Sequence, residues 1–254
     1  MGLAARLLAL SFFTLSALRN KIFTKSSIHE IIRRLFLFVP VLTASLLAGE
    51  RYALVIGNGA YQHGTVLPNP AQDATLVSGA LRAAGFEVIA KADLGLEGLR
   101  GALADFQKKV RAGNPEAVAF YYAGHGMERE GSNYLVPVDA HVTDEFQIPT
   151  RTYPLTEVLG ALDQTKSPLK IVILDCCRNN PLGRSYRSYS RDGGGGLAAL
   201  TGTPEGTVIA YATSPGKTAL DGEGANSPFA KALANALGEN GLTVEVSSSG
   251  PSGK

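Results

Sequence analysis

The chain has 254 residues, 45% of them hydrophobic, and its 24 basic and 22 acidic side chains leave a net charge of +2. This apolar fraction suffices for a buried core, which argues against a disordered chain. The near-neutral charge provides no extended positive field, so a general nucleic-acid binder is disfavoured. Cys176 and Cys177 are the only cysteines and are adjacent. A bridge between neighbours would be strained, so any role they have is expected to be as thiols.

The charge is distributed unevenly along the chain. Residues 1–50 contain six basic and two acidic side chains, whereas the remainder has a net charge of −2. Two uncharged apolar runs, 7–18 and 35–49, are shorter than a membrane-spanning helix but fit the hydrophobic core of an export signal. The second run follows Arg33 and Arg34 and resembles a twin-arginine signal. We predict a targeting or anchor segment over residues 1–50, and hence a periplasmic, secreted or membrane-anchored protein; the alternative is a spurious extension of a cytoplasmic one.

From residue 51 onward, strand-like and helix-like stretches alternate, which favours an α/β fold with a mostly parallel sheet. The run 52–57 is continuously apolar, as in a strand covered on both faces. Asn69 and Pro70 suit the N-cap and first residue of a helix that stops at Gly85. Further strands are expected at 86–90, 117–122, 134–138, 170–174 and 207–212, and further helices at 96–110, 155–162 and 228–237, the last opened by Ser227.

Two chemically suggestive segments follow expected strands. Residues 123–126 (AGHG) come after the third central strand, and residues 175–178 (DCCR) come after the fourth. Ligands of open parallel sheets bind at the carboxyl ends of the strands, so His125 and a cysteine could lie within reach of each other. A thiol and a general base are the minimum for an activated nucleophile. Taken singly, such a cysteine is usually a buried hydrophobe and such a histidine a structural residue; their joint placement favours the catalytic interpretation.

At these residues the chain resembles the caspase-like cysteine peptidases, particularly the bacterial relatives of metacaspases. The resemblance covers about residues 52–242, and the 52-residue offset from His125 to Cys177 also fits that family. It implies a caspase-like, three-layer sandwich around the central sheet. The segments that carry the resemblance are 51–59 (RYALVIGNG), 69–81, 121–126 (YYAGHG), 134–139 (YLVPVD), 171–181 (IVILDCCRNNP) and 212–215 (ATSP).

The resemblance implies a Cys–His dyad. Cys177 takes the place of the nucleophile, Cys176 is a spectator, and His125 transfers the proton of the thiol to the leaving amine. The backbone N–H groups of Gly126 and Cys177 would form the oxyanion hole. No third catalytic residue is visible in the sequence, and the family does not require one.

The resemblance also implies a substrate preference. In the metacaspase-like branch, acids at the positions of Asp73 and Asp175 line the pocket for the residue before the cut, and Asp221 is a candidate third acid. Carboxylates in one pocket favour Arg or Lys. The alternatives are that Asp73 complements the charge of a helix N-terminus and that Asp175 is purely structural.

Residues 182–206 form a Gly/Ser/Arg-rich stretch without periodicity inside the predicted peptidase domain, which we place at residues 51–242. In the family, a linker at this position is often cleaved during maturation. Arg184, Arg187 and Arg191 are therefore candidate self-cleavage sites; the alternative is a solvated flexible insert without a role. Residues 243–254 are linker-like where the family continues into another helix, so we expect a linker or truncated tail there.

No cofactor or metal ligand set is expected. Residues 57–59 (GNG) lack the helix that a dinucleotide loop needs, and His63, His125, His141 and the cysteine pair lack zinc spacing. Calcium, which many metacaspases use, stays open, because Asp139, Asp144 and Glu145 lie near the relevant region without matching a ligand set.

The leading functional hypothesis is a cysteine endopeptidase that cuts protein or peptide substrates after Arg or Lys. Its expected partners are those substrates, with no nucleic acid, and a membrane would be contacted only through residues 1–50. One alternative is a catalytically silent caspase-like scaffold or binding module. Another is a thiol redox protein that uses Cys176 and Cys177, which leaves His125 without a role.

Overall fold

The computed structural model describes residues 49–177, 197, 203–212 and 224–238, and for Cys177 it describes the backbone alone. The predicted N-terminal segment, most of the Gly/Ser/Arg-rich stretch and the predicted tail lie outside these residues. Within the described part, no helix is long and apolar enough to cross a membrane.

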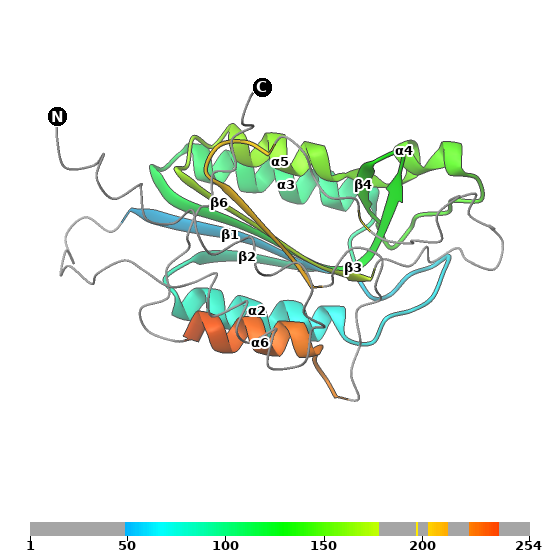
Figure 1. Ribbon diagram of the computed structural model, residues 1–254, viewed down its shortest axis with the longest axis horizontal. Helices are drawn as coiled ribbons and strands as arrows, with labels where there is room; N and C mark the ends of the chain where they lie inside the picture. The colour runs from blue at the N-terminus through cyan, green and yellow to red at the C-terminus, as the bar shows by residue number, and fades with distance from the viewer. Residues whose placement is uncertain (1–48, 178–196, 198–202, 213–223, 239–254) are drawn as a thin grey trace, which may run out of the picture.

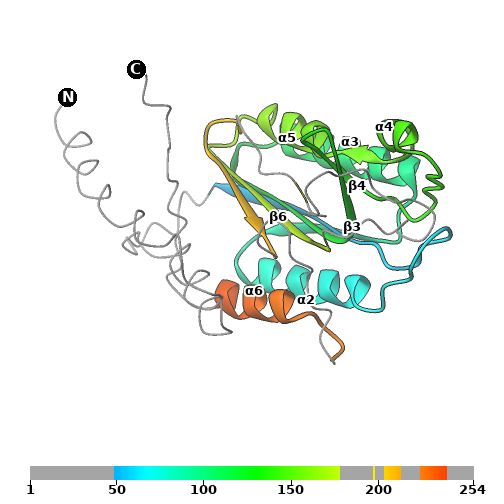
Figure 2. The same cartoon turned by 45° about the vertical axis from the view of Figure 1, so that its right-hand side comes forward.

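Among the described residues, five parallel strands form the centre of the sheet in the order β2-β1-β3-β6-β7 (Figure 1). These strands are β1 (Glu50–Gly57), β2 (Glu87–Ala92), β3 (Pro115–Arg129), β6 (Leu169–Cys177) and β7 (Thr207–Tyr211). Strand β7 pairs with β6 at the edge of the described sheet (Figure 2). The order confirms the predicted α/β class, since consecutive parallel strands require helical crossovers.

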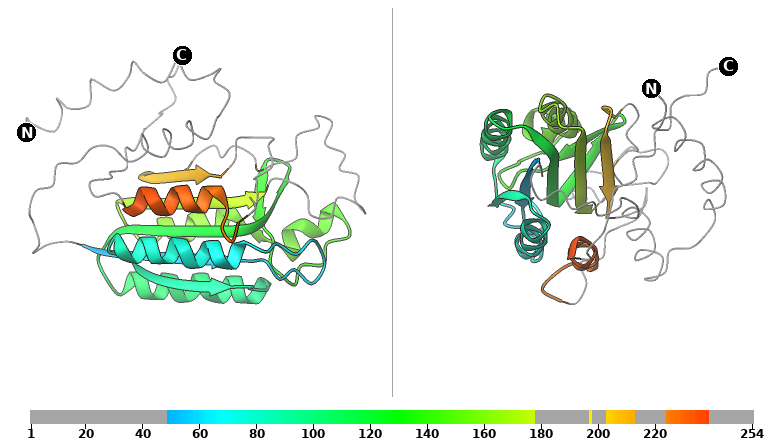
Figure 3. Two further views of the ribbon diagram at one scale, coloured as in Figure 1. Left: turned by 90° about the horizontal axis from the view of Figure 1, so that it is seen from below. Right: turned by 90° about the vertical axis from the view of Figure 1, so that its left-hand side faces the viewer.

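Helices cover both faces of this sheet, which makes three layers (Figure 3). Helices α3 (Leu96–Arg111) and α5 (Leu155–Asp163) bury one core cluster that includes Phe106, Leu162 and Val172. Helices α2 (Pro70–Ala83) and α6 (Pro228–Gly238) lie side by side on the other face and bury a second cluster that includes Val77 and Leu233. Because side chains alternate between the two faces of a strand, the same strands contribute residues to both clusters.

Two central strands are longer than the sequence indicated. The apolar runs suggested ends near residues 122 and 174, but β3 continues to Arg129 and β6 to Cys177. After His125, β3 changes its partner from β6 to the antiparallel strand β4 (Ser132–Leu135). His125 and Cys177 thus lie within paired strands rather than in loops beyond them, because the ladder hydrogen bonds continue past the apolar residues.

Short elements beyond β4 were not predicted. They are the 3₁₀ helix η2 (Glu145–Gln147), helix α4 (Ile148–Arg151) and strand β5 (Tyr153–Pro154), which pairs with β4. The expected strand 134–138 is shorter and begins earlier, as β4. Asn69 occupies the predicted N-cap position of α2, but its side chain makes no capping hydrogen bond because Asn69 itself has helical backbone angles.

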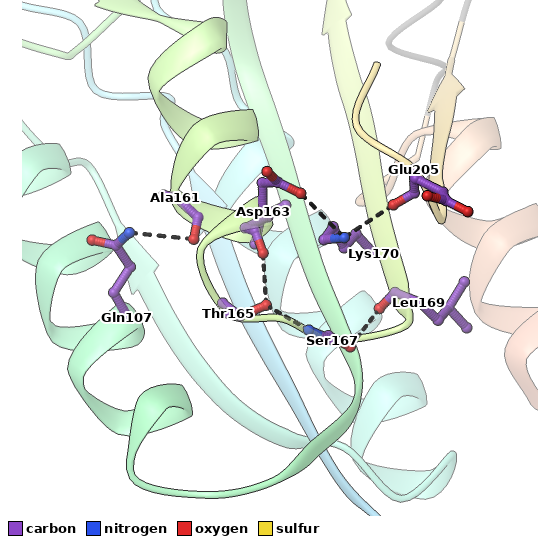
Figure 4. A network of polar contacts seen from close by, with 9 residues as sticks. Gln107, Ala161, Asp163, Thr165, Ser167, Leu169, Lys170 and Glu205 are labelled. Atoms are coloured by element: carbon purple, nitrogen blue, oxygen red, sulfur yellow. Dashed lines mark hydrogen bonds and ion pairs between the residues drawn. The ribbon is translucent and has the colours of Figure 1, made fainter.

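A polar network at the start of β6 holds the end of the sheet opposite to His125 (Figure 4). The ammonium group of Lys170, a side chain only 7% exposed, donates to the carbonyl oxygen of Glu205 at 3.0 Å and lies 3.4 Å from Oδ1 of Asp163. The Thr165 hydroxyl donates to the carbonyl of Leu162 at 2.6 Å. This network joins α5, β6 and the segment before β7, so it fixes the strand that ends in Cys177.

Candidate active site

The two predicted catalytic residues occupy paired positions on neighbouring strands. In the parallel register of β3 and β6, Gly124 is opposite Cys176 and His125 is opposite Cys177. Neighbouring strands are about 4.8 Å apart, so the backbones of His125 and Cys177 are adjacent. The structure therefore brings together the base and the nucleophile that the sequence proposed.

The imidazole of His125 is only 6% exposed, and Nε2 lies 2.8 Å from the carbonyl oxygen of Thr65. A carbonyl can only accept, so Nε2 carries a proton in this contact and Nδ1 is the ring nitrogen that can accept one. Thr65 was missed by the sequence analysis because its contribution is a backbone carbonyl, for which no residue type gives a signal.

Cys176 belongs to the core rather than to the site. Its side chain is 2% exposed and packs in the cluster of Val172 and Leu174 on the α3/α5 side. A Cβ added at Gly126 would lie 3.2 Å from the sulfur of Cys176. Strand positions two apart share a face, so position 177 belongs to the face of Asp175, and Cys176 belongs to the opposite one.

Asp73 of α2 and Asp175 of β6 meet around Ser227. Asp73, 2% exposed, accepts through Oδ1 from the Asn226 amide at 3.0 Å and the Ser227 backbone N–H at 2.9 Å. Asp175, 8% exposed, accepts through Oδ2 from the hydroxyls of Tyr121 and Ser227, each at 3.0 Å. These four donors are neutral. Two buried carboxylates thus share one serine, a link that was not predicted from the sequence.

Ser227 also caps α6, as predicted, because its Oγ accepts from the backbone N–H of Ala230 at 3.0 Å. The pKa of Tyr121 is raised well above its usual value of 10 by burial, and further by the charges of Asp175 and Asp73. Tyr121 therefore stays protonated and remains a donor to Asp175 throughout the physiological range.

Two of the acids considered as calcium ligands instead accept hydrogen bonds from backbone N–H groups at the starts of helices. Asp139 accepts from the N–H of Leu96 at the start of α3, and Asp144 accepts from the N–H of Phe146 in η2. Within the described ranges, no three His, Cys, Asp or Glu side chains are grouped so that they could hold a metal ion. His63 and His141 stack with ring centroids 4.5 Å apart. The candidate residues Asp221, Arg184, Arg187 and Arg191 lie outside the described residues.

The backbone N–H groups that follow Gly57 and Asn58 are bonded to a side chain of the protein and are not open to a ligand. The N–H groups of Gly59 and Ala60 both donate to Oδ1 of Asp93 at 2.8 Å. A carboxylate thus binds the N–H groups that a dinucleotide loop would offer to a phosphate.

A cavity of about 600 Å³ lies beside Arg111, Asn114 and Lys166, away from His125.

Comparison with known proteins relates this site to one family. The peptidase C14 family model, described as the caspase domain, matches residues 50–248. The human mucosa-associated lymphoid tissue lymphoma translocation protein 1 is 31% identical over 135 residues, which are 52% of this chain and 15% of the human protein. Its homologue from Mus musculus is 30% identical over 139 residues, or 54% of this chain and 16% of the mouse protein.

Among solved structures, the Drosophila initiator caspase Dronc is similar with a TM-score of 0.44 and 13% identity, over 71% of this chain and 70% of that one. The chain spans less than a fifth of the length of the two curated relatives. The narrower assignment to a bacterial, metacaspase-like branch stays a prediction. The family model alone covers most of the chain, and the chain therefore belongs to the caspase-domain family of peptidases.

Proposed function

We propose that this chain is a cysteine endopeptidase that cuts after Arg or Lys, with Cys177 as nucleophile and His125 as general base. The observation that carries the proposal is the parallel register that pairs His125 with Cys177 at the end of β6. Membership in the caspase-domain family supports the peptidase chemistry.

The proposed reaction begins with transfer of the Cys177 thiol proton to Nδ1 of His125. The thiolate then attacks the scissile carbonyl carbon, and the C–N bond breaks as His125 returns the proton to the departing amine. The resulting thioester is hydrolysed by water that loses a proton to His125, which regenerates the thiol and releases the acid. The carbonyl of Thr65 keeps the second ring nitrogen protonated throughout.

Stabilisation of the oxyanion is assigned to the backbone N–H groups of Gly126 and Cys177. Gly126 follows His125 directly in β3, and Cys177 is the last residue of β6. Removal of one oxyanion donor typically slows a reaction by about 10²–10³-fold. In this proposal, the same strand pairing that joins base and nucleophile also supplies the two donors.

The preference for Arg or Lys is assigned to Asp73 and Asp175. Each is buried, and each of the bonded oxygens accepts from neutral donors. Buried carboxylates favour a cationic partner, and a substrate guanidinium or ammonium group is one. Asp221 is proposed as a third acid of the same pocket.

Self-cleavage after Arg184, Arg187 or Arg191 follows from such a preference, and we propose it as a maturation step. Incubation of the purified chain and mapping of new N-termini tests it. New termini after these arginines, absent from Cys177→Ala, are expected. A wild-type chain that stays intact while it cuts Arg peptides contradicts the maturation step alone.

The activity itself is tested with fluorogenic peptides that carry Arg, Lys, Asp or citrulline before the cut. Wild type is expected to release the fluorophore from the Arg and Lys peptides, and Cys177→Ala is expected to release none. Absence of wild-type turnover on both basic peptides, with and without calcium, would favour the silent-scaffold alternative.

A further inference from the structure

The backbone of His125 is held by two buried tyrosines that the proposed mechanism has not used. The N–H of His125 donates to the hydroxyl of Tyr61 at 2.7 Å. The hydroxyl of Tyr122 lies 3.4 Å from that of Tyr61 and donates to the carbonyl oxygens of Val136 at 2.8 Å and His125 at 3.2 Å. Both sides of the His125 peptide backbone are therefore bonded to one tyrosine pair.

The hydrogen bonds have a consistent direction. The single hydroxyl proton of Tyr122 is shared between the carbonyl oxygens of Val136 and His125, so Tyr61 donates to Tyr122 and accepts from the N–H of His125. The N–H of Val136 in turn donates to the carbonyl of His125 at 3.0 Å, which closes the ring of contacts. Burial raises the pKa of both tyrosines above the usual value of 10, so both phenols keep the protons that this direction requires.

Tyr61 contacts the imidazole as well as the backbone. The two rings have centroids 4.4 Å apart and are tilted by 42°. Tyr61 belongs to the segment between β1 and α2, and the same segment carries Thr65, whose carbonyl accepts from Nε2 of His125. One buried side chain therefore fixes the base directly and anchors the loop that orients its ring.

The glycine before the histidine fits the same arrangement. Gly124 has φ +153°, and a Cβ there would lie 2.6 Å from the hydroxyl of Tyr61 and 2.9 Å from that of Tyr122. Real Cβ atoms do not approach other heavy atoms this closely. Residue 124 must therefore be glycine for both hydroxyls to reach the backbone of His125.

We propose that Tyr61 and Tyr122 form a positioning pair for the general base, in which their hydroxyls fix the His125 backbone and the Tyr61 ring fixes the imidazole. The inference rests on the proposed function, because it concerns the base of that reaction. Neither tyrosine touches the scissile bond in this assignment. Their effect is on the alignment of Nδ1 with the thiol of Cys177, to which proton transfer is sensitive at the level of about 1 Å.

The test uses the full chain with Tyr61→Phe and Tyr122→Phe, and with Tyr52→Phe as a matched control. Tyr52 is a buried tyrosine near the start of β1, at the other end of the strand from the Tyr61 segment. Tyr61→Phe is expected to lower kcat for an Arg peptide by about 10–100-fold and to leave KM within about twofold. Tyr122→Phe is expected to have a smaller effect of the same kind, and Tyr52→Phe none.

A second measurement does not depend on turnover. Iodoacetamide labelling of Cys177 at neutral pH, followed by mass spectrometry, reports how well His125 activates the thiol. The labelling rate is expected to fall in Tyr61→Phe and Tyr122→Phe, while thermal unfolding and near-UV circular dichroism show that the variants are folded. If one of the two variants fails to fold, the labelling rate and kcat of the other decide.

The outcomes separate the two hypotheses. Wild-type kcat and labelling rates in folded Tyr61→Phe and Tyr122→Phe would overturn the positioning pair and leave the peptidase proposal intact. A wild type without turnover and without enhanced thiol reactivity would overturn both, since no base would then be in position. A rise in KM at constant kcat would also contradict a positioning role.

Discussion

His125 and Cys177 are paired across two parallel strands although 52 residues separate them in the sequence. The distance between their backbones is therefore set by strand pairing and not by the conformation of a loop. The pairing also distinguishes the two cysteines, because Cys176 is opposite Gly124 and packs in the core on the α3/α5 side.

Cys177→Ala is therefore expected to abolish turnover of an Arg peptide, whereas Cys176→Ala should keep it within about threefold. Cys176→Ala removes a buried sulfur and should lower the free energy of unfolding by about 1 kcal/mol. Peptide kinetics and urea unfolding of both variants provide the measurement. Loss of activity in Cys176→Ala together with an active Cys177→Ala would identify the other thiol as nucleophile.

Asp175→Asn keeps the shape of the side chain and one acceptor oxygen but removes the charge. Because a buried charge pair with the substrate would be lost, kcat/KM for Arg peptides should fall about 100-fold or more, while a citrulline peptide is cut as before. Asp73→Asn should act in the same direction.

Asp105→Asn is the matched control for both acids, since Asp105 is exposed on α3. Its kinetics should equal those of wild type. Equal losses on Arg and citrulline peptides in Asp175→Asn would instead show that this acid is structural, and a loss in Asp105→Asn would point to a general charge effect.

Ser227→Ala removes a helix cap and one donor to Asp175 at once. The lost cap should cost about 1 kcal/mol of unfolding free energy, and the loss of one of the hydrogen bonds to Asp175 should add a comparable amount. KM for Arg peptides is expected to rise. Urea unfolding and peptide kinetics measure the two effects separately.

Ser227→Thr retains the hydroxyl and should recover most of both losses. Thr165→Val, which deletes a buried hydroxyl at the opposite end of the sheet, should lower stability without a change in KM. If Thr165→Val and Ser227→Ala raise KM alike, the effect of Ser227 is one of general stability.

The buried tyrosines give the protein a defined alkaline limit. The folded-state pKa of Tyr61, Tyr121 and Tyr122 exceeds the usual value of 10, chiefly because of burial, and that of Tyr153 is raised to about 12 by burial. Below pH 10 both folded and unfolded states keep these protons. Above it the unfolded chain releases them first, so stability is lost as the pH rises toward the folded-state values.

A phenolate absorbance titration is the measurement. Burial also raises the pKa of Tyr52, and these five of the nine tyrosines should be missing from the step near pH 10 and should ionise later, as the chain unfolds. Tyr153→Phe should make the fall in stability above pH 10 less steep. A single step near pH 10 that includes all nine, with the fold intact, would show that they are not held in their protonated form.

Much of the scaffold was predictable because the strands are nearly uninterrupted apolar runs. The runs at 52–57, 117–122 and 170–174 correspond to β1, β3 and β6, and the helix spacings correspond to α2, α3 and α5. Their ends were not predictable, since polar residues such as His125 and Asp175 extend the strands through backbone hydrogen bonds. Such bonds depend on the neighbouring strand and not on residue type.

The site was predictable where residue types carry the chemistry. His125 and the cysteine pair were visible as side chains, but the carbonyl of Thr65 was not. Tyr122 had appeared only as part of an apolar strand and Tyr61 had not been singled out, since their hydrogen bonds to the His125 backbone depend on the folded arrangement. Ser227 was recognised as a cap of α6. Its hydrogen bonds to Asp73 and Asp175 could not be predicted, because they depend on where α6 packs in the fold.

The contact between Asp73 and Ser227 spans 154 residues, whereas β3 and β6 pair across about 50. During synthesis, the strands that carry His125 and Cys177 emerge and can pair before α6 has left the ribosome. A chain at that stage has its base and thiol strands side by side, but its two acids lack the donors that Asn226 and Ser227 provide. Docking of α6 therefore completes the buried contacts of Asp73 and Asp175 last, after the strands of His125 and Cys177 can already pair.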